Sequence, residues 1–149
     1  MQAEMLAPAA VLIAWSLIML VWMGSARLPA MKRMGGGLAN SKAGGRGQDL
    51  EGVLDDRINW KSHNYTHLME QPTLFYAASL IVALLGPATG DVWAAWAYVV
   101  LRIVHSLWQS LVNTVPLRFL LFMASTAALA WLTGRALVLT LFTDTGVLA

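Results

Sequence analysis

The sequence predicts an all-α membrane protein, an antiparallel bundle of four transmembrane helices that forms one domain over residues 1–149. Composition is the first reason: 58% of the 149 residues are hydrophobic and 12% are charged, whereas about a quarter of the residues in a soluble domain are charged. The second reason is that four apolar runs approach or exceed the roughly twenty residues that cross a bilayer. No basic, aromatic-interleaved surface points to nucleic acid. We therefore expect a lipid bilayer as the surroundings and no nucleic-acid partner.

The first predicted span covers residues 6–26. Pro8 lies in its first turns, where a missing N–H costs least. The preceding residues carry Glu4 and no Lys or Arg, unlike the basic start of a signal peptide, and the run is long for one. We therefore expect a span that is retained.

Residues 27–62 differ from the rest of the chain because they contain seven of its ten Lys and Arg residues and many glycines. Glycine-rich composition predicts an irregular loop. Within it, Leu50, Val53, Leu54 and Ile58 recur at helical spacing, which leaves two alternatives open: a short surface helix, or a solvated loop. By the positive-inside rule the loop is cytoplasmic and both termini lie on the other side. In a bacterium this multi-pass protein would lie in the inner, or plasma, membrane.

Three further spans are predicted at residues 64–85, 92–112 and 117–142. Pro72 should bend the second span, since it removes a helical N–H. Gly86 and Pro87 end that span, and Asp91 is a suitable N-cap for the third. Arg135, near the end of the last span, is expected to extend to the far interface.

Polar residues form two stripes within the second and third spans. The first stripe contains Asn64, His67 and Glu70, and the second contains Arg102, His105 and Gln109, which share one helix face. Arg118 begins the fourth span at the same side of the membrane. Lipid tolerates neither stripe, so both must face protein or water. Two readings follow: a functional pocket, or structural glue in which a buried Glu70 pairs with Arg102.

The chemistry of this cluster suits a peptide with several anionic groups and one cation. Arg118 and Lys61 could bind carboxylates, the arginine as a bidentate fork, and Glu70 could accept an ammonium. Phe75, Phe119 and Phe122 could accommodate a lipophilic small molecule that arrives from the bilayer. Glutathione fits this description, and an anionic lipid headgroup fits nearly as well.

A metal site is not predicted. His63, His67 and Glu70 are spread over about half the circumference of a helix, because their spacing is four and then three residues. No second group of ligands completes a site, and the absence of cysteine excludes thiolate ligands.

Three segments carry a resemblance to a known family: HLMEQPTLFY (67–76), WAYVVLRIVHSLWQ (96–109) and NTVPLRF (113–119). With them the chain resembles the MAPEG superfamily, the membrane-associated proteins in eicosanoid and glutathione metabolism. The sequences of these three segments are most similar to the prokaryotic branch of the superfamily. The resemblance implies a four-helix bundle assembled as a homotrimer, with glutathione as co-substrate between neighbouring subunits near the cytoplasmic side.

The resemblance also implies roles for individual residues. Arg118 matches the arginine that stabilises the thiolate, and a guanidinium beside a thiol favours its charged form, so Arg118 is the predicted catalytic residue. The residues predicted to bind glutathione are Lys61, Asn64, His67, Glu70, Arg102, His105 and Gln109. Three positions depart from the pattern of the eicosanoid enzymes: His67 replaces Asn, Gln109 replaces Tyr, and Phe119 replaces a residue with a hydroxyl.

The expected function is a glutathione-dependent transferase or peroxidase-like activity on lipophilic electrophiles. The alternative is a non-catalytic membrane protein of the same fold that binds a lipid or uses the polar residues for assembly.

Overall fold

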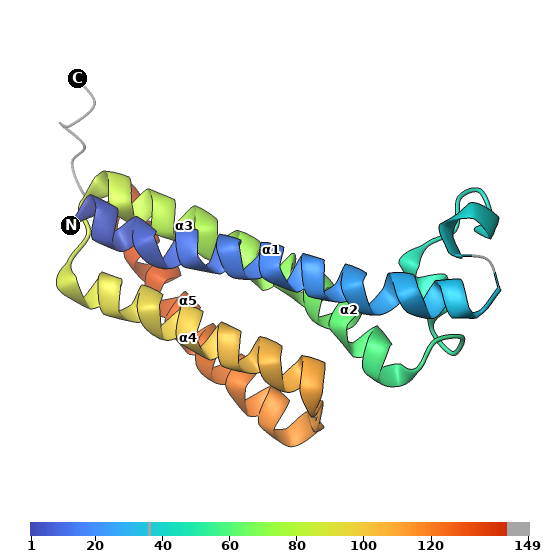
Figure 1. Cartoon of the computed structure of the whole chain (residues 1–149). Coiled ribbons are helices and arrows are strands. Elements are labelled where there is room, and N and C mark those ends of the chain that lie inside the picture. The colour runs from blue at the N-terminus through green and yellow to red at the C-terminus, as the bar shows by residue number, and fades with distance from the viewer. Residues whose placement is uncertain (36, 143–149) are drawn as a thin grey trace.

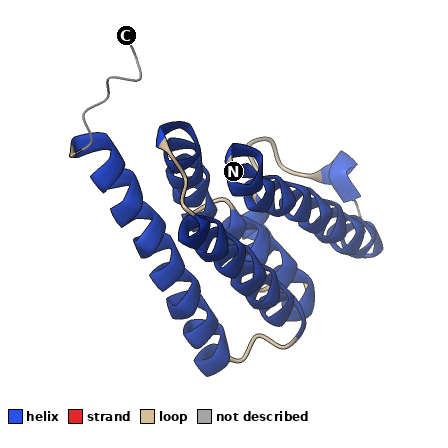
Figure 2. Cartoon of the chain, turned by 90° about the vertical axis from the view of Figure 1, so that its left-hand side faces the viewer, coloured by secondary structure: helices blue, strands red, loops and turns tan. Residues whose placement is uncertain are grey.

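The computed structural model describes residues 1–35 and 37–142, and this part of the chain contains helices and loops but no strand (Figures 1 and 2). The α-helices are α1 (Gln2–Arg33), α2 (Asp56–Leu68), α3 (Gln71–Leu85), α4 (Thr89–Leu111) and α5 (Val115–Leu141). Two short 3₁₀ turns, η1 (Gly37–Asn40) and η2 (Gly47–Leu50), lie in the loop between α1 and α2. The predicted all-helical fold is confirmed.

The helices form a bundle in which α1 runs beside α2 and α3, while α4 and α5 make an antiparallel pair (Figure 1). Helix α5 also packs on α3, and α1 packs on α4. The N-terminus lies at the same end as the connection between α3 and α4, and the long loop lies at the opposite end (Figure 1). In the core, the rings of Phe75 and Tyr98 stack with centroids 4.3 Å apart. Phe75 is therefore a core residue and contributes to no pocket for a lipophilic molecule.

Three helical segments are long and apolar enough to cross a membrane: Gln2–Arg33, Asp56–Leu85 and Val115–Leu141. Helix α4 has 23 residues, which is long enough to cross a membrane. It is not one of these three because the residues of its polar stripe lower its hydropathy. Arg102, His105 and Gln109 are all buried against the other helices. Their polar groups thus face protein instead of lipid, as a polar residue inside a membrane must.

The predicted second span is interrupted, since α2 ends at Leu68 and α3 begins at Gln71. Pro72 is the cause, because it has no N–H to donate to the carbonyl of Leu68 and its ring would clash with that carbonyl. Glu70 is the N-cap of the new helix, and its carbonyl accepts hydrogen bonds from the N–H and hydroxyl of Thr73. A bend at Pro72 was expected, but not a break two residues earlier. Glu70 is consequently outside both helices.

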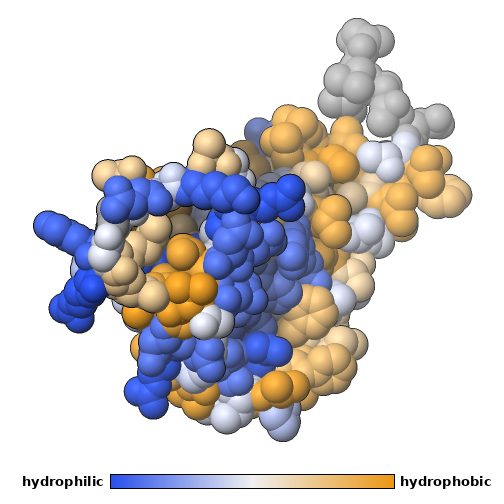
Figure 3. All heavy atoms as spheres, turned by 90° about the vertical axis from the view of Figure 1, so that its right-hand side faces the viewer, coloured by the Kyte–Doolittle hydropathy of each residue, from blue (hydrophilic) through white to orange (hydrophobic). Residues whose placement is uncertain are grey.

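The helices also extend beyond the predicted spans at the loop end. Helix α1 continues seven residues past residue 26, to Arg33, and α2 begins at Asp56, before the expected start at 64. Asp55 accounts for the early start, because its side chain accepts the N–H of Arg57 as an N-cap. The space-filling view of this end shows hydrophilic atoms gathered around a hydrophobic patch (Figure 3).

At the far end of the bundle, Asp91 and Arg135 have roles that differ from those predicted. Asp91 is not the N-cap but the third residue of α4, and its Oδ2 accepts the N–H of Ala88. Its Oδ1 accepts hydrogen bonds from Nε of Arg135, at 3.0 Å, and from Nε1 of Trp131, at 3.2 Å. Arg135 therefore pairs with a buried carboxylate instead of extending alone to the interface.

Candidate functional site

A polar pocket of about 420 Å³ lies at the loop end of the bundle. It receives residues from the loop, from α2, from the break between α2 and α3, from α4 and from α5. The residues that line it are Gln48, Glu51, Ser62, His63, Thr66, His67, Glu70, Gln109 and Arg118. Four of the residues predicted from the sequence, His67, Glu70, Gln109 and Arg118, are therefore brought together here.

A smaller pocket of about 150 Å³ adjoins it and is mostly apolar. The first turns of α5 provide most of its wall, with one histidine from α2 and one from α4. It is lined by His67, His105, Val115, Arg118, Phe119 and Phe122. His67 and Arg118 line both pockets, so these two side chains stand where the polar and the apolar compartments meet.

The corner between α4 and α5 holds Arg118 in place. Nη1 of Arg118 donates to Oδ1 of Asn113 at 2.6 Å. Asn113 has a φ of 58°, a left-handed conformation that Asn adopts more readily than other residues with a side chain. Its N–H donates to the carbonyl of Trp108 at 2.8 Å. Asn113 thus both closes the corner and orients the guanidinium.

His67 is held on several sides. Its Nδ1 lies 2.8 Å from Oε2 of Glu70, and its ring lies 5.1 Å from that of His105 and 5.4 Å from that of Phe122. The backbone carbonyl of His67 accepts a hydrogen bond from Nη2 of Arg102 at 2.9 Å. That carbonyl is among the last of α2 and lacks an intrahelical partner, so the helix break creates the acceptor that Arg102 uses.

The structure does not contain the ion pair between a buried Glu70 and Arg102 that one of the two readings of the sequence predicted. The side chain of Glu70 is 61% exposed and pairs with His67, whereas Arg102 is 1% exposed and lines neither pocket. Arg102 lies within the bundle and supports the chain at the break. Its position is therefore behind the site, not in it.

Asn64 and Lys61 also lie outside the two pockets. Asn64 is buried, and its Nδ2 donates at 2.8 Å to the hydroxyl of Ser106, which also accepts from Nε1 of Trp15. Lys61 points to the opposite side of α2, where its Nζ donates to the carbonyl of Arg57 and lies 5.2 Å from the centre of the Trp22 ring. The structure does not bring either residue together with Arg118.

Gln109 faces the polar pocket from α4 although it is largely buried. Its Oε1 is buried and has no hydrogen-bond partner among the residues that the structure describes. A buried polar atom of this kind is costly unless something binds it. Gln109 is accordingly ready to accept a hydrogen bond from a molecule in the pocket.

Four residues of the polar pocket were missed: Gln48 and Glu51, which lie in the glycine-rich loop, and Ser62 and Thr66 on α2. Oε1 of Glu51 lies 2.8 Å from Nε2 of His63 on α2, so the loop folds back over that helix. His63 was considered only as a metal ligand. No periodicity in the sequence could have indicated a contact that depends on how the loop returns to the bundle.

Fold and site together define a class: a helical membrane protein whose polar and apolar pockets meet at an arginine near one end of the bundle. A model of the MAPEG family matches residues 5–138, and the chain belongs to this family. The family includes glutathione transferase- and peroxidase-like members as well as non-catalytic ones. No curated protein and no solved structure matches the chain. The resemblance seen in the sequence is thus confirmed, and its prokaryotic branch stays a prediction.

Proposed function

We propose that the protein binds glutathione in the polar pocket and joins it, through its sulfur atom, to a lipophilic electrophile in the apolar pocket. The observation that carries this proposal is the shared position of Arg118 and His67 on both pockets. A reaction between a charged peptide and an apolar molecule requires a place where both environments meet, because moving the charged peptide into apolar surroundings costs free energy.

The residues of the polar pocket offer hydrogen-bond partners for the polar groups of glutathione. The peptide has two carboxylates and one ammonium. Ser62, Thr66 and Gln109 offer hydrogen-bond donors to the carboxylates, and Glu51 and Glu70 offer carboxylates to the ammonium. Glu51 and Glu70 already contact histidines, which would keep both carboxylates in position for the peptide.

Arg118 would activate the thiol. A positive charge beside a thiol stabilises the thiolate, which is the nucleophile. The thiolate then attacks an electrophilic carbon, a carbon–sulfur bond forms, and the leaving group departs with the bonding electrons. Phe119 and Phe122 would hold the apolar reactant against the sulfur. The bond from Arg118 to Asn113 keeps the guanidinium fixed, so little reorganisation is needed during the reaction.

A homotrimer would complete the site. The polar pocket is open on the side where Glu70 and His63 are exposed, and a neighbouring subunit placed there would enclose the peptide. We propose this assembly in a bilayer, with the loop on the cytoplasmic side, as the positive-inside rule favours.

The direct test compares Arg118→Ala with Arg57→Ala in detergent. Both changes remove an arginine, but Arg57 is exposed and lines neither pocket. With glutathione and 1-chloro-2,4-dinitrobenzene, kcat/KM should fall by about 100-fold or more in Arg118→Ala, the usual cost of losing one electrostatic stabiliser, and should be unchanged in Arg57→Ala.

Size-exclusion chromatography distinguishes a role of Arg118 in catalysis from a role in assembly. If Arg118→Ala retains full activity, Arg118 does not activate the thiol. If that variant dissociates, the arginine serves assembly. If the wild type neither turns over nor gains thermal stability with millimolar glutathione, the non-catalytic alternative is favoured, since a bound ligand must stabilise the folded state.

A further inference from the structure

A third pocket, separate from the site above, lies between the last turns of α1 and the loop that follows. We call it the loop groove. Its volume is about 670 Å³. Much of its lining is hydrophobic and includes Met23, Met31, Leu38, Leu50, Val53 and Leu54.

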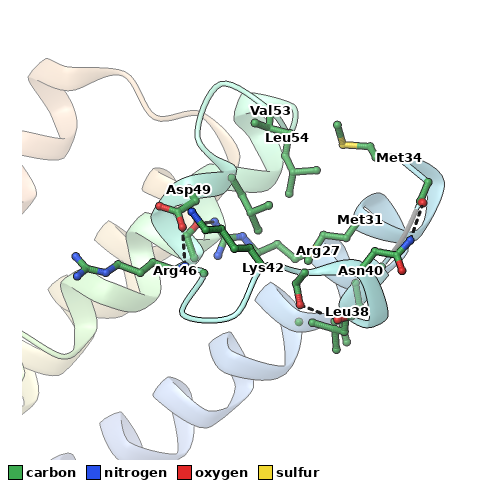
Figure 4. Close-up of a pocket in the computed structure, with 18 of the residues that line it drawn as sticks. Arg27, Met31, Met34, Leu38, Asn40, Lys42, Arg46, Asp49, Val53 and Leu54 are labelled. Atoms are coloured by element: carbon green, nitrogen blue, oxygen red, sulfur yellow. Dashed lines mark hydrogen bonds between the residues drawn. The ribbon is translucent and has the colours of Figure 1, made fainter.

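The loop groove also contains cationic side chains. Arg27 and Lys42 extend toward the end of the groove near Asp49, while Met34 and Leu38 lie at the opposite end (Figure 4). The carboxylate of Asp49 already accepts the N–H of Arg46. The lining includes three cationic side chains, Arg27, Lys42 and Arg46, and one carboxylate, Asp49, so the groove is positive.

Arg27 is fixed in place as part of the groove. Its Nη2 donates to the carbonyl of Gly47 at 2.7 Å and to Oδ1 of Asn59 at 3.2 Å. A Cβ on Gly47 would lie 2.8 Å from Nη1 of Arg27, so a side chain at this position would displace the end of the arginine. Nε of Arg27 is buried and has no partner among the described residues. The guanidinium is therefore held rigidly and keeps an unused donor.

The loop groove crosses the level at which the membrane ends. Met23 and Gly24 belong to the predicted span of residues 6–26, and Arg27 lies about one helical turn beyond them. Lipid phosphates lie in the interfacial layer directly outside the hydrocarbon. A molecule in the groove would therefore meet hydrophobic residues at the depth of acyl chains and cations at the depth of phosphates.

We propose that the loop groove binds one anionic phospholipid. Its phosphate lies between Arg27 and Lys42, and the upper part of one acyl chain lies against Met23 and Gly24. The groove shares no lining residue with the two pockets described above.

The test uses full-length protein, freed of lipid in detergent, and titrates it with dioleoyl phosphatidylglycerol or dioleoyl phosphatidylcholine. Native mass spectrometry counts bound lipids, and thermal unfolding reports stabilisation. Wild type should bind one phosphatidylglycerol more tightly than phosphatidylcholine. Lys42→Gln should weaken this binding about fivefold, which corresponds to the contribution of one lysine near an anionic surface.

The matched control is Lys32→Gln, since Lys32 is an exposed lysine at the end of α1 that does not line the groove. It should bind phosphatidylglycerol like wild type. Gly24→Leu tests the apolar part of the groove. An added Cβ meets no atom within 4 Å and leucine favours the helix, so the variant should not lose stability. Its binding of phosphatidylglycerol should weaken.

The proposal is overturned if phosphatidylcholine binds as tightly as phosphatidylglycerol, or if Lys42→Gln and Lys32→Gln lose equal affinity. It is also overturned if oleate alone binds as tightly as phosphatidylglycerol, since the occupant would then be a fatty acid.

Discussion

Asn113 decides where the guanidinium of Arg118 lies. It combines a left-handed backbone, with φ at 58°, and a side chain that accepts from Nη1 at 2.6 Å. The two contributions can be separated, because glycine retains the backbone freedom and loses the acceptor. Asn113→Gly should therefore unfold at the same temperature as wild type, within a few degrees, but bind glutathione less tightly or react more slowly.

The companion variants Asn113→Asp and Asn113→Ala complete this prediction. Asp keeps an acceptor for Arg118 and should retain most of the activity. Ala loses the acceptor and also strains the left-handed backbone, which costs about 1 kcal/mol, so its melting temperature should fall. Equal activity in all three variants would show that the guanidinium needs no support from this corner.

At the scale of elements, Asp91 and Arg135 connect α4 to α5 at the end of the bundle away from the site. Asp91 is 1% exposed, whereas the side chain of Arg135 is 31% exposed. Removing Arg135 leaves a buried carboxylate without its cation, which should cost about 3 kcal/mol. The free energy of unfolding in detergent should therefore fall in Arg135→Ala.

A second change should recover this loss. In the background of Arg135→Ala, Asp91→Asn removes the unpaired charge and keeps an oxygen for the N–H of Ala88. We expect the double variant to be more stable than Arg135→Ala, a coupling that a double-mutant cycle measures. Strictly additive losses would mean that the two residues act separately. Glutathione turnover should be unaffected, since the pair is remote from both pockets.

At the scale of the whole molecule, the sequence predicted the helices well because long apolar runs leave few alternatives. The predicted span 117–142 differs little from α5 (Val115–Leu141). The break at Met69 and Glu70 was not foreseen, since a proline permits several local solutions. The choice among them depends on tertiary partners, here Arg102 at the carbonyl of His67.

The site was predicted only in part, because some of its contacts also depend on tertiary partners. The two predicted polar stripes included His67 and Gln109, and Arg118 was placed at the same side of the membrane, because this part of the prediction required only geometry along each helix. The rotation of α2 about its axis sends Lys61 toward Trp22, and the return of the loop places Glu51 beside His63. Both depend on packing between elements that are distant in the sequence.

The central claim is that Arg118 makes a thiolate where the two pockets meet, and the ultraviolet absorbance of the thiolate tests it most directly. Glutathione is titrated onto wild type and Arg118→Ala well below the ordinary thiol pKa of about 8.5, with S-methylglutathione as the ligand that cannot ionise. Wild type should gain thiolate absorbance on binding glutathione, and Arg118→Ala should not. Saturable binding without that absorbance, or equal absorbance in the variant, would contradict the account.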